Sequence, residues 1–214
     1  MNGAYSRVAW FYNAWSRLTE SKSSKKVMEF AAIQGGERIL EVAVGTGLTF
    51  AEIVRFNSKG LNYGIDISES MLAKAKQLMK GFPEECYHLQ IGNARRLPFD
   101  ANTFDLVVNN FMLDLLPEEE FEAVLGEFGR VLRPGGRMVL STMTFGRKWY
   151  NGIWQWIAEH FPSLLTGCRP VFVDHYLEQS GFEIVQSAYV SQNTFPSQVL
   201  KARKRDMPYQ RVAP

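Results

Sequence analysis

Cysteine is scarce in this chain, and neither sign of charge is in excess. The two cysteines, Cys86 and Cys168, lie far apart and form no CxxC or Cys/His spacing. We therefore expect no disulfide framework and no metal site, and a reducing, cytoplasmic setting is the simpler inference. Lys and Arg number 24 against 22 Asp and Glu, and they are spread along the chain. This distribution argues against a nucleic-acid partner held by its phosphates.

Long apolar runs are also missing. No run approaches the roughly 18 residues of a membrane helix, and the first residues lack the regions that define a signal peptide. A soluble protein is therefore expected. With 214 residues, 46% of them hydrophobic, the chain is long enough for one well-buried domain over 1–214 and short for two.

A third glycine is absent from the turn in "EVAVGTGLTF", residues 41–50. The dinucleotide-binding pattern G-x-G-x-x-G, counted from Gly45, requires a glycine where the chain has Phe50. Because that third glycine permits close packing of helix on strand, an NAD site is disfavoured. Gly45 and Gly47 still allow backbone N–H groups to approach a ligand closely.

Apolar, β-branched runs alternate with segments of helical spacing. The runs cover 38–44, 61–67, 86–92, 104–110, 136–144, 182–190 and 197–203. Helical spacing is found at 48–54, 68–80 and 117–133, the last two beginning with Ser68 and Pro117. This alternation predicts a doubly wound α/β fold. Pro134, Gly135 and Gly136 are expected to end one helix and turn the chain into the next strand.

Two aromatic-rich segments do not fit the alternation. We interpret residues of about 1–34 as lid helices and about 145–181 as a substrate-pocket insertion, because both join the sheet near the edge where α/β folds bind ligands. The insertion concentrates aromatic area, which indicates either an apolar acceptor or a core that packs the insertion onto the sheet. These aromatic residues are Trp149, Tyr150, Trp154, Trp156 and Phe161.

Four stretches resemble, in order, the motifs of class I S-adenosylmethionine-dependent methyltransferases. They are "EVAVGTG", "GIDISESML", "GNARRLPFDANTFDLVVNNFMLDLLP" and "EFGRVLRPGGRMVLSTMT". The resemblance covers most of the chain and implies a Rossmann-like seven-stranded sheet, mostly parallel, with an antiparallel last strand at 197–203. It also implies S-adenosyl-L-methionine as cofactor and S-adenosyl-L-homocysteine as product.

The resemblance assigns roles to two carboxylates. Asp66, at the end of the second strand, is expected to accept hydrogen bonds from the ribose hydroxyls of the cofactor, with helix capping as the alternative. Glu41 is expected to orient the glycine turn or the methionine ammonium of the cofactor. The alternative is that Glu41 contacts only the residues that bind the cofactor.

Two positions depart from the family pattern. Ala43 replaces the first glycine, which is tolerable if its φ is negative. Asn93 replaces a usual Asp whose oxygen accepts a bond from the adenine amino group, and an amide oxygen can do the same. Ala94 would offer its backbone N–H to the ring, while Ile67 and Met71 would cover the adenine faces.

The segment "YSRVAWFYNAW" resembles a tyrosine-containing lid of small-molecule methyltransferases. Tyr5 and Tyr12 are seven residues apart and share a helical face, so Tyr12 could bond the cofactor carboxylate and Tyr5 could face the substrate. Two core aromatics on an amphipathic helix are the alternative.

After the fourth strand, "NNFMLDLLP" brings polar residues near the expected reaction mouth. Asn109 and Asn110 lie there, and we expect Asn110 to contact the cofactor. Phe111 is expected to contact the substrate, and Asp114 is the candidate base or substrate-orienting group. A structural role for Asp114 is equally open. Arg169 either binds an anionic group in the pocket or forms a loop salt bridge. Structural roles are favoured for His160 and His175.

No residue pattern in the chain identifies the methyl acceptor. The resemblance favours a small apolar or lipid-like acceptor, such as a quinone precursor, with phosphatidylethanolamine N-methylation as the alternative. Either acceptor would bring transient contact with a membrane surface, for which Lys22, Lys25 and Lys26 are ordinary candidates. A non-catalytic cofactor- or RNA-binding module using the basic end "KARKRDMPYQR" is the hypothesis from another class.

Overall fold

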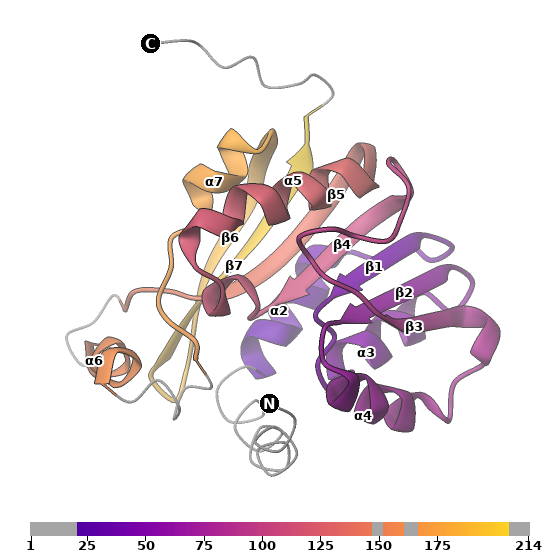
Figure 1. Ribbon diagram of the computed structural model, residues 1–214, viewed down its shortest axis with the longest axis horizontal. Coiled ribbons are helices and arrows are strands. Elements are labelled where there is room, and N and C mark those ends of the chain that lie inside the picture. Colours follow the sequence, from indigo (N-terminus) through magenta and orange to yellow (C-terminus); the bar gives the residue numbers. More distant parts are fainter. Residues whose placement is uncertain (1–20, 147–151, 161–166, 206–214) are drawn as a thin grey trace.

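The computed structural model describes residues 21–146, 152–160 and 167–205. Its centre is a seven-stranded sheet in the order β3-β2-β1-β4-β5-β7-β6 (Figure 1). All strand pairs are parallel except those made by β7, which is antiparallel to both β5 and β6. The predicted fold class and the antiparallel last strand are confirmed. The strands are β1 (Arg38–Val42), β2 (Leu61–Asp66), β3 (Tyr87–Ile91), β4 (Phe104–Asn110), β5 (Leu132–Met143), β6 (Phe182–Gln192) and β7 (Phe195–Lys204).

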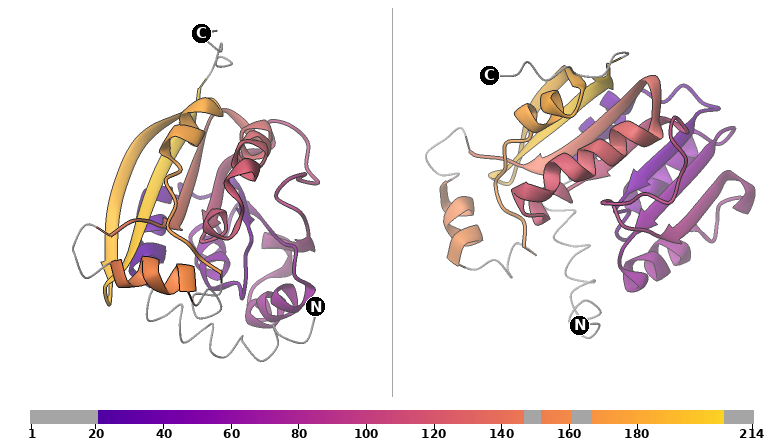
Figure 2. Two further views of the ribbon diagram at one scale, coloured as in Figure 1. Left: turned by 60° about the vertical axis from the view of Figure 1, so that its left-hand side comes forward. Right: turned by 45° about the horizontal axis from the view of Figure 1, so that its top comes forward.

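Helices cover both faces of the sheet, as a doubly wound fold requires (Figures 1 and 2). One face carries α5 (Phe121–Val131) and α7 (Asp174–Gln179), and the other carries α2 (Ser21–Ala31), α3 (Leu48–Phe56) and α4 (Glu69–Met79). Three short 3-10 turns, Glu84–Cys86, Leu113–Leu115 and Glu118–Glu120, lie in the connections. Among the described residues, no helix is long and apolar enough to cross a membrane.

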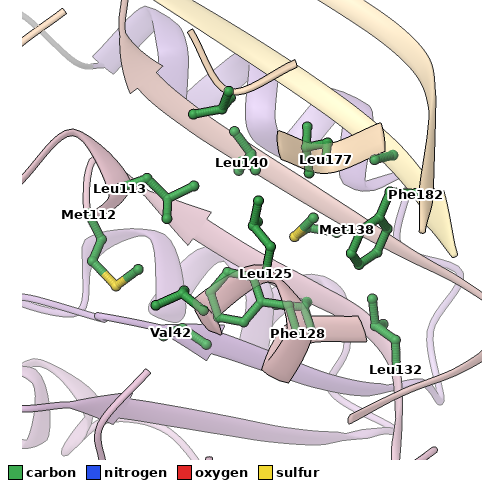
Figure 3. Packing of buried hydrophobic residues seen from close by; sticks show 14 of the residues in the cluster. Val42, Met112, Leu113, Leu125, Phe128, Leu132, Met138, Leu140, Leu177 and Phe182 are labelled. Carbon is green, nitrogen blue, oxygen red and sulfur yellow. The ribbon is translucent and has the colours of Figure 1, made fainter. Parts of the chain in front are cut away.

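Burial explains why the strands read as continuous apolar runs. The central strand β4 is buried at its first six positions, whereas the edge strand β3 has no buried residue. Leu125 and Phe128 of α5 and Leu177 of α7 pack with strand residues such as Met138 in the largest core cluster (Figure 3). A run buried on both faces carries no alternation, since each successive side chain meets a helical layer.

Helix α2 belongs to this core. Val27, Phe30 and Ala31 are buried against strand residues, and both ends of the helix are held by distant parts of the chain. The Lys22 backbone N–H donates to Gln192 Oε1 (2.6 Å), and Arg137 donates to the Ala31 carbonyl (2.7 Å). Helix α2, the described helix of the expected lid, is therefore packed into the fold, while residues 1–20 lie outside the described residues.

Two boundaries differ from the sequence-based expectation. β5 begins at Leu132 rather than 136, because the Pro134–Gly136 turn is accommodated as an irregularity in the β4–β5 register. Helix α7 lies against α5 and β6 with Leu177 in the main core, so it forms part of the helical layer. The expected insertion of about 145–181 also contains α6 (Gly152–His160), beside the β6–β7 turn (Figures 1 and 2), and its role as a substrate pocket stays a prediction.

Replacing Arg137 with Met should lower the free energy of unfolding by about 1–3 kcal/mol, because a mostly buried ion pair and a helix-end cap are lost together. Arg137 pairs with Glu37 (2.8 Å), both side chains being mostly buried. Burial alone would raise the pKa of Glu37, but the bonds from Arg137 and the Gln34 N–H lower it overall. A lowered folded-state pKa means that this stabilisation is present above 4.5, the usual value, and is lost as pH falls through the folded pKa. Urea unfolding should thus show a smaller difference between variant and parent in acid; an equal difference at both pH values would contradict this assignment.

Candidate functional site

The glycine turn after β1 is held in place by Asp66. One carboxylate oxygen accepts the Gly45 N–H (2.8 Å) and the other accepts the Ser68 N–H (2.8 Å), so this side chain joins the turn to the start of α4. Gly47 has a φ of 87°, and a Cβ there would meet Ala75 of α4 at 3.0 Å. The second glycine is thus required both by its backbone angle and by close helix packing.

Ala43 does not have the negative φ that its tolerance was expected to need. Its φ is 61°, in the left-handed region, so that expectation was wrong. An L-residue in this region loses roughly 1–2 kcal/mol relative to the right-handed region. The first position of the turn therefore requires glycine-like geometry, and the chain meets that requirement with strain.

A cavity of about 290 Å³ lies beside this turn. It brings together five of the predicted site residues: Glu41, Ala43, Gly45, Asn110 and Phe111. The remaining lining comes from the turn itself, from α2, α3 and α4, namely Ser21, Ser24, Lys25, Val44, Thr46, Leu48, Thr49, Ala51, Glu52, Arg55 and Leu78.

Glu41 is the buried acid of this cavity. Its side chain is only 2% exposed, and Oε2 has no hydrogen-bond partner. Burial raises the pKa of Glu41 well above its usual value, the nearby Asp66 and Glu52 carboxylates raise it further, and a bond from Asn110 opposes the rise. A buried acceptor that faces a cavity without a partner is suited to a cationic or hydrogen-bond-donating ligand.

Asn110 ends β4 at the cavity wall. Its amide donates to Thr49 Oγ1 (3.2 Å) and its oxygen accepts from Ser141 Oγ (2.9 Å). These contacts link α3, β4 and β5 around the cavity. Its neighbour Asn109 instead donates to the Val42 carbonyl (2.9 Å) and is fully buried, so Asn109 clamps β4 to β1.

The residues predicted to hold the adenosine half lie at the end of β2, in α4 and on the adjoining loops, and they do not line the cavity. Asp66 is 7% exposed, and burial raises its pKa although three backbone N–H bonds oppose this. Ile67 is 68% exposed, whereas Met71 is mostly buried. Asn93 Oδ1 accepts the Arg95 N–H (2.9 Å), and Ala94 follows it in the same loop. Their contacts with adenosine stay predictions.

Asp114 and Arg169 are engaged in the fold. Asp114 is fully buried; its Oδ2 accepts the Met143 N–H (2.9 Å), and its carbonyl accepts the Arg169 N–H (3.1 Å). Arg169 donates to the Leu116 carbonyl (2.6 Å) and pairs with Glu118 (3.2 Å). Neither side chain lines the cavity, and these contacts favour the structural alternatives that were left open for both.

The remaining candidate residues do not line the cavity or are not described. His160 stacks on Trp156 at the end of α6 and His175 lies against Tyr176 on α7, both exposed and away from the cavity lining. Tyr5 and Tyr12 lie outside the described residues. Sequence reasoning missed Ser21, Ser24 and Thr49 as lining residues, and it assigned Lys25 only to a membrane surface. Ser21, Ser24 and Lys25 are spaced i, i+3 and i+4, which places them on one helical face, and this spacing could have grouped them from the sequence.

The chain is similar to known proteins over the segment that forms this site. A family described as a methyltransferase domain matches residues 39–136. The demethylmenaquinone methyltransferase of Bacillus mycoides (strain KBAB4) is 31% identical over 173 residues, which are 80% of this chain and 69% of that protein. The chain belongs to the class I S-adenosylmethionine-dependent methyltransferases. The demethylmenaquinone methyltransferase of Bacillus cereus (strain B4264) is 36% identical over 116 residues, which are 54% of this chain and 48% of that protein.

Solved structures confirm the fold. Magnesium protoporphyrin IX methyltransferase from Synechocystis PCC 6803, with bound S-adenosylhomocysteine, has a TM-score of 0.68 at 20% identity and covers 85% of this chain and 83% of its own. The [4+2]-cyclase SpnF has a TM-score of 0.69 at 21% identity, covering 86% and 80% respectively. Since a cyclase shares this fold, the fold alone does not define the reaction.

The residues present fit S-adenosylmethionine. The glycine turn offers backbone N–H groups, the unpartnered Glu41 oxygen offers an acceptor for a cation, and Asp66 ends the adjacent strand. When bound, the cofactor supplies an electrophilic methyl group on a sulfonium. Glu41, Asn110, Phe111, the turn and part of α2 line the cavity, so these are the residues that would orient the cofactor and keep water from it.

Ala43→Gly should stabilise the protein by about 0.5–1 kcal/mol, because relief of the left-handed strain exceeds the entropy that glycine adds to the unfolded chain. The measurement is urea unfolding without ligand. Ala73→Gly is the matched control: Ala73 is exposed in the interior of α4, and its replacement should destabilise by about 0.5–1 kcal/mol. A loss of stability at both positions would contradict the strain assigned to Ala43.

Glu41→Gln should raise the stability of the ligand-free methyltransferase by about 1 kcal/mol or more at neutral pH, because a buried, poorly partnered carboxylate is removed. Since the folded pKa of Glu41 is raised, the unfolded state releases its proton first, and parental stability falls as pH rises from 4.5 toward the folded pKa. The variant should lack this decline in thermal melts and should bind S-adenosylmethionine more weakly in calorimetry. Unchanged affinity would remove Glu41 from the cofactor site.

Proposed function

We propose that this methyltransferase acts on a small apolar, ring-bearing acceptor of the quinone-precursor type. The observation that carries this proposal is the position of Phe111. Its side chain lines the cavity beside the glycine turn and also belongs to an apolar cluster with Met143, Cys168 and Phe195. The cofactor cavity and this apolar cluster, which we call the apolar wall, therefore meet at Phe111.

The apolar cluster is built at the carboxyl ends of the strands. Trp154 and Ile157 of α6 pack against it, and Trp154 meets Phe195 edge to face at 5.3 Å between ring centroids. The Trp154 indole N–H donates to Thr194 Oγ1 (3.0 Å), which attaches α6 to the β6–β7 turn. Such a wall favours an apolar acceptor, because its aromatic faces exclude water and offer few polar partners.

The backbone at Phe111 supports a functional role for this position. Its φ is 48°, an uncommon angle for a large side chain, and its N–H donates to the Ser141 carbonyl (2.9 Å). Strain of this kind persists where surrounding contacts enforce it, and it clusters at ligand sites. The strain turns the chain sharply at the end of β4, where the ring reaches both the cavity and the cluster.

The relatives point the same way. Several are demethylmenaquinone methyltransferases, whose name gives a demethylated quinone as their substrate. Methyl transfer to such a ring is an in-line displacement that depends on alignment and exclusion of water. For this chain we assign the alignment to Phe111 and Asn110, and we leave the base unassigned, since Asp114 is held by the fold.

Incubation of the protein with labelled S-adenosylmethionine and separate acceptor pools tests this proposal. Demethylated quinones should accept label, whereas phosphatidylethanolamine vesicles should not. Phe111→Leu should reduce kcat/KM for the quinone by on the order of tenfold, because the aromatic face is lost while apolar volume is largely kept.

Phe172→Leu is the matched control. Phe172 is 57% exposed and stacks on Phe145 outside the cluster, so its replacement should leave turnover unchanged. Labelling of phosphatidylethanolamine with no labelling of quinones would overturn the proposed acceptor class. Cofactor binding without transfer to any pool would favour a non-catalytic module instead.

A further inference from the structure

One face of α2 presents polar side chains to the cofactor cavity. Ser21, Ser24 and Lys25 all line the cavity, at i, i+3 and i+4 along the helix. This spacing places them on one side, while Val27, Phe30 and Ala31 pack into the core from an adjacent side. The helix therefore has a buried face that fixes it and a second face directed at the site.

Lys25 differs from its neighbour in its contacts. Lys26 pairs with Glu29 (2.6 Å) and lies over the Phe30 ring, outside the cavity lining. Within the described part of the chain, no acidic side chain forms an ion pair with Lys25. The ammonium group of Lys25 is thus available to a ligand in the cavity.

The two cations that line the cavity differ in their surroundings. The Gln192 side chain fixes the part of α2 that precedes Lys25, through the Lys22 N–H and the Ser21 hydroxyl. Arg55, the other cation that lines the cavity, lies in the last turn of α3, where the dipole is negative, and its guanidinium lies 5.4 Å from the Phe82 ring centroid. Lys25 is accordingly the better placed cation.

A second observation points to a ligand with both signs of charge. The buried, unpartnered Oε2 of Glu41 belongs to the same cavity and requires a donor or a cation. An acid from the end of β1 and a base from α2 thus line one space from separate elements. A zwitterionic amino-acid group satisfies both.

We propose that Lys25, with the Ser24 hydroxyl, binds the carboxylate of the methionine tail of S-adenosylmethionine, while Glu41 faces its ammonium group. In this arrangement α2 is a fixed half of the cofactor site, whatever residues 1–20 add to it. The proposal does not depend on which acceptor is methylated.

Calorimetric titration with S-adenosylmethionine and with its decarboxylated form tests the assignment, because the two ligands differ only in the carboxylate. Lys25→Met should weaken binding of S-adenosylmethionine by about tenfold or more, the loss expected for a bond to a charged group. Binding of the decarboxylated ligand should stay unchanged. Lys25→Gln should reproduce this pattern, and Lys25→Arg should restore much of the affinity.

Lys26→Met is the matched control, since the same substitution one residue along leaves the cavity lining intact. It should bind both ligands as the parent does. Arg55→Met separates the two cations of the cavity: a selective loss of S-adenosylmethionine affinity in this variant, with none in Lys25→Met, would overturn the proposal. Equal weakening of both ligands by Lys25→Met and Lys25→Gln, with parental melting temperatures, would also overturn it, because the effect would not involve the carboxylate.

Discussion

The two hydrogen bonds accepted by the Asp66 carboxylate connect the parts on which the site depends. Gly45 belongs to the turn after β1 and Ser68 to the start of α4, so one side chain sets the turn and the adjacent helix relative to each other. Parallel pairing of β1 with β2 brings Asp66 and the turn to the same edge of the sheet. The left-handed angles of Ala43, Gly45 and Gly47 follow from the path that this edge imposes.

The site also shows where stability is exchanged for binding. Glu41 is buried without a partner for Oε2, Ala43 has a strained φ, and so does Phe111. Each feature destabilises the ligand-free fold, and each lies on the wall of one cavity. Such costs persist where surrounding packing enforces them, and here the fully buried strand β4 and the core cluster beneath it supply that packing.

The substrate selection that we propose depends on a different set of contacts. Phe111 joins the cofactor cavity to a cluster that includes Phe195, and α6 closes this cluster through Trp154. The Asn193–Thr194 turn between β6 and β7 has positive φ at both positions, as a tight two-residue hairpin requires. Gln192, just before this turn, holds the start of α2. One hairpin thus positions both the apolar wall and the helix proposed to bind the cofactor tail.

The sequence by itself determined the alternation of strands and helices, the glycine turn and the family, because local spacing and turn chemistry are written in consecutive residues. It predicted Glu41, Gly45, Asn110 and Phe111, which the structure brings to one cavity, since parallel strands present their carboxyl ends at one edge. Tertiary structure decided what spacing cannot express. The φ of Ala43, the burial of Asp114 and the ion pair of Arg169 depend on partners distant in sequence. Lys25 likewise resembles any surface lysine until α2 packs on the sheet and places that residue in the lining of the cavity that Glu41 also lines.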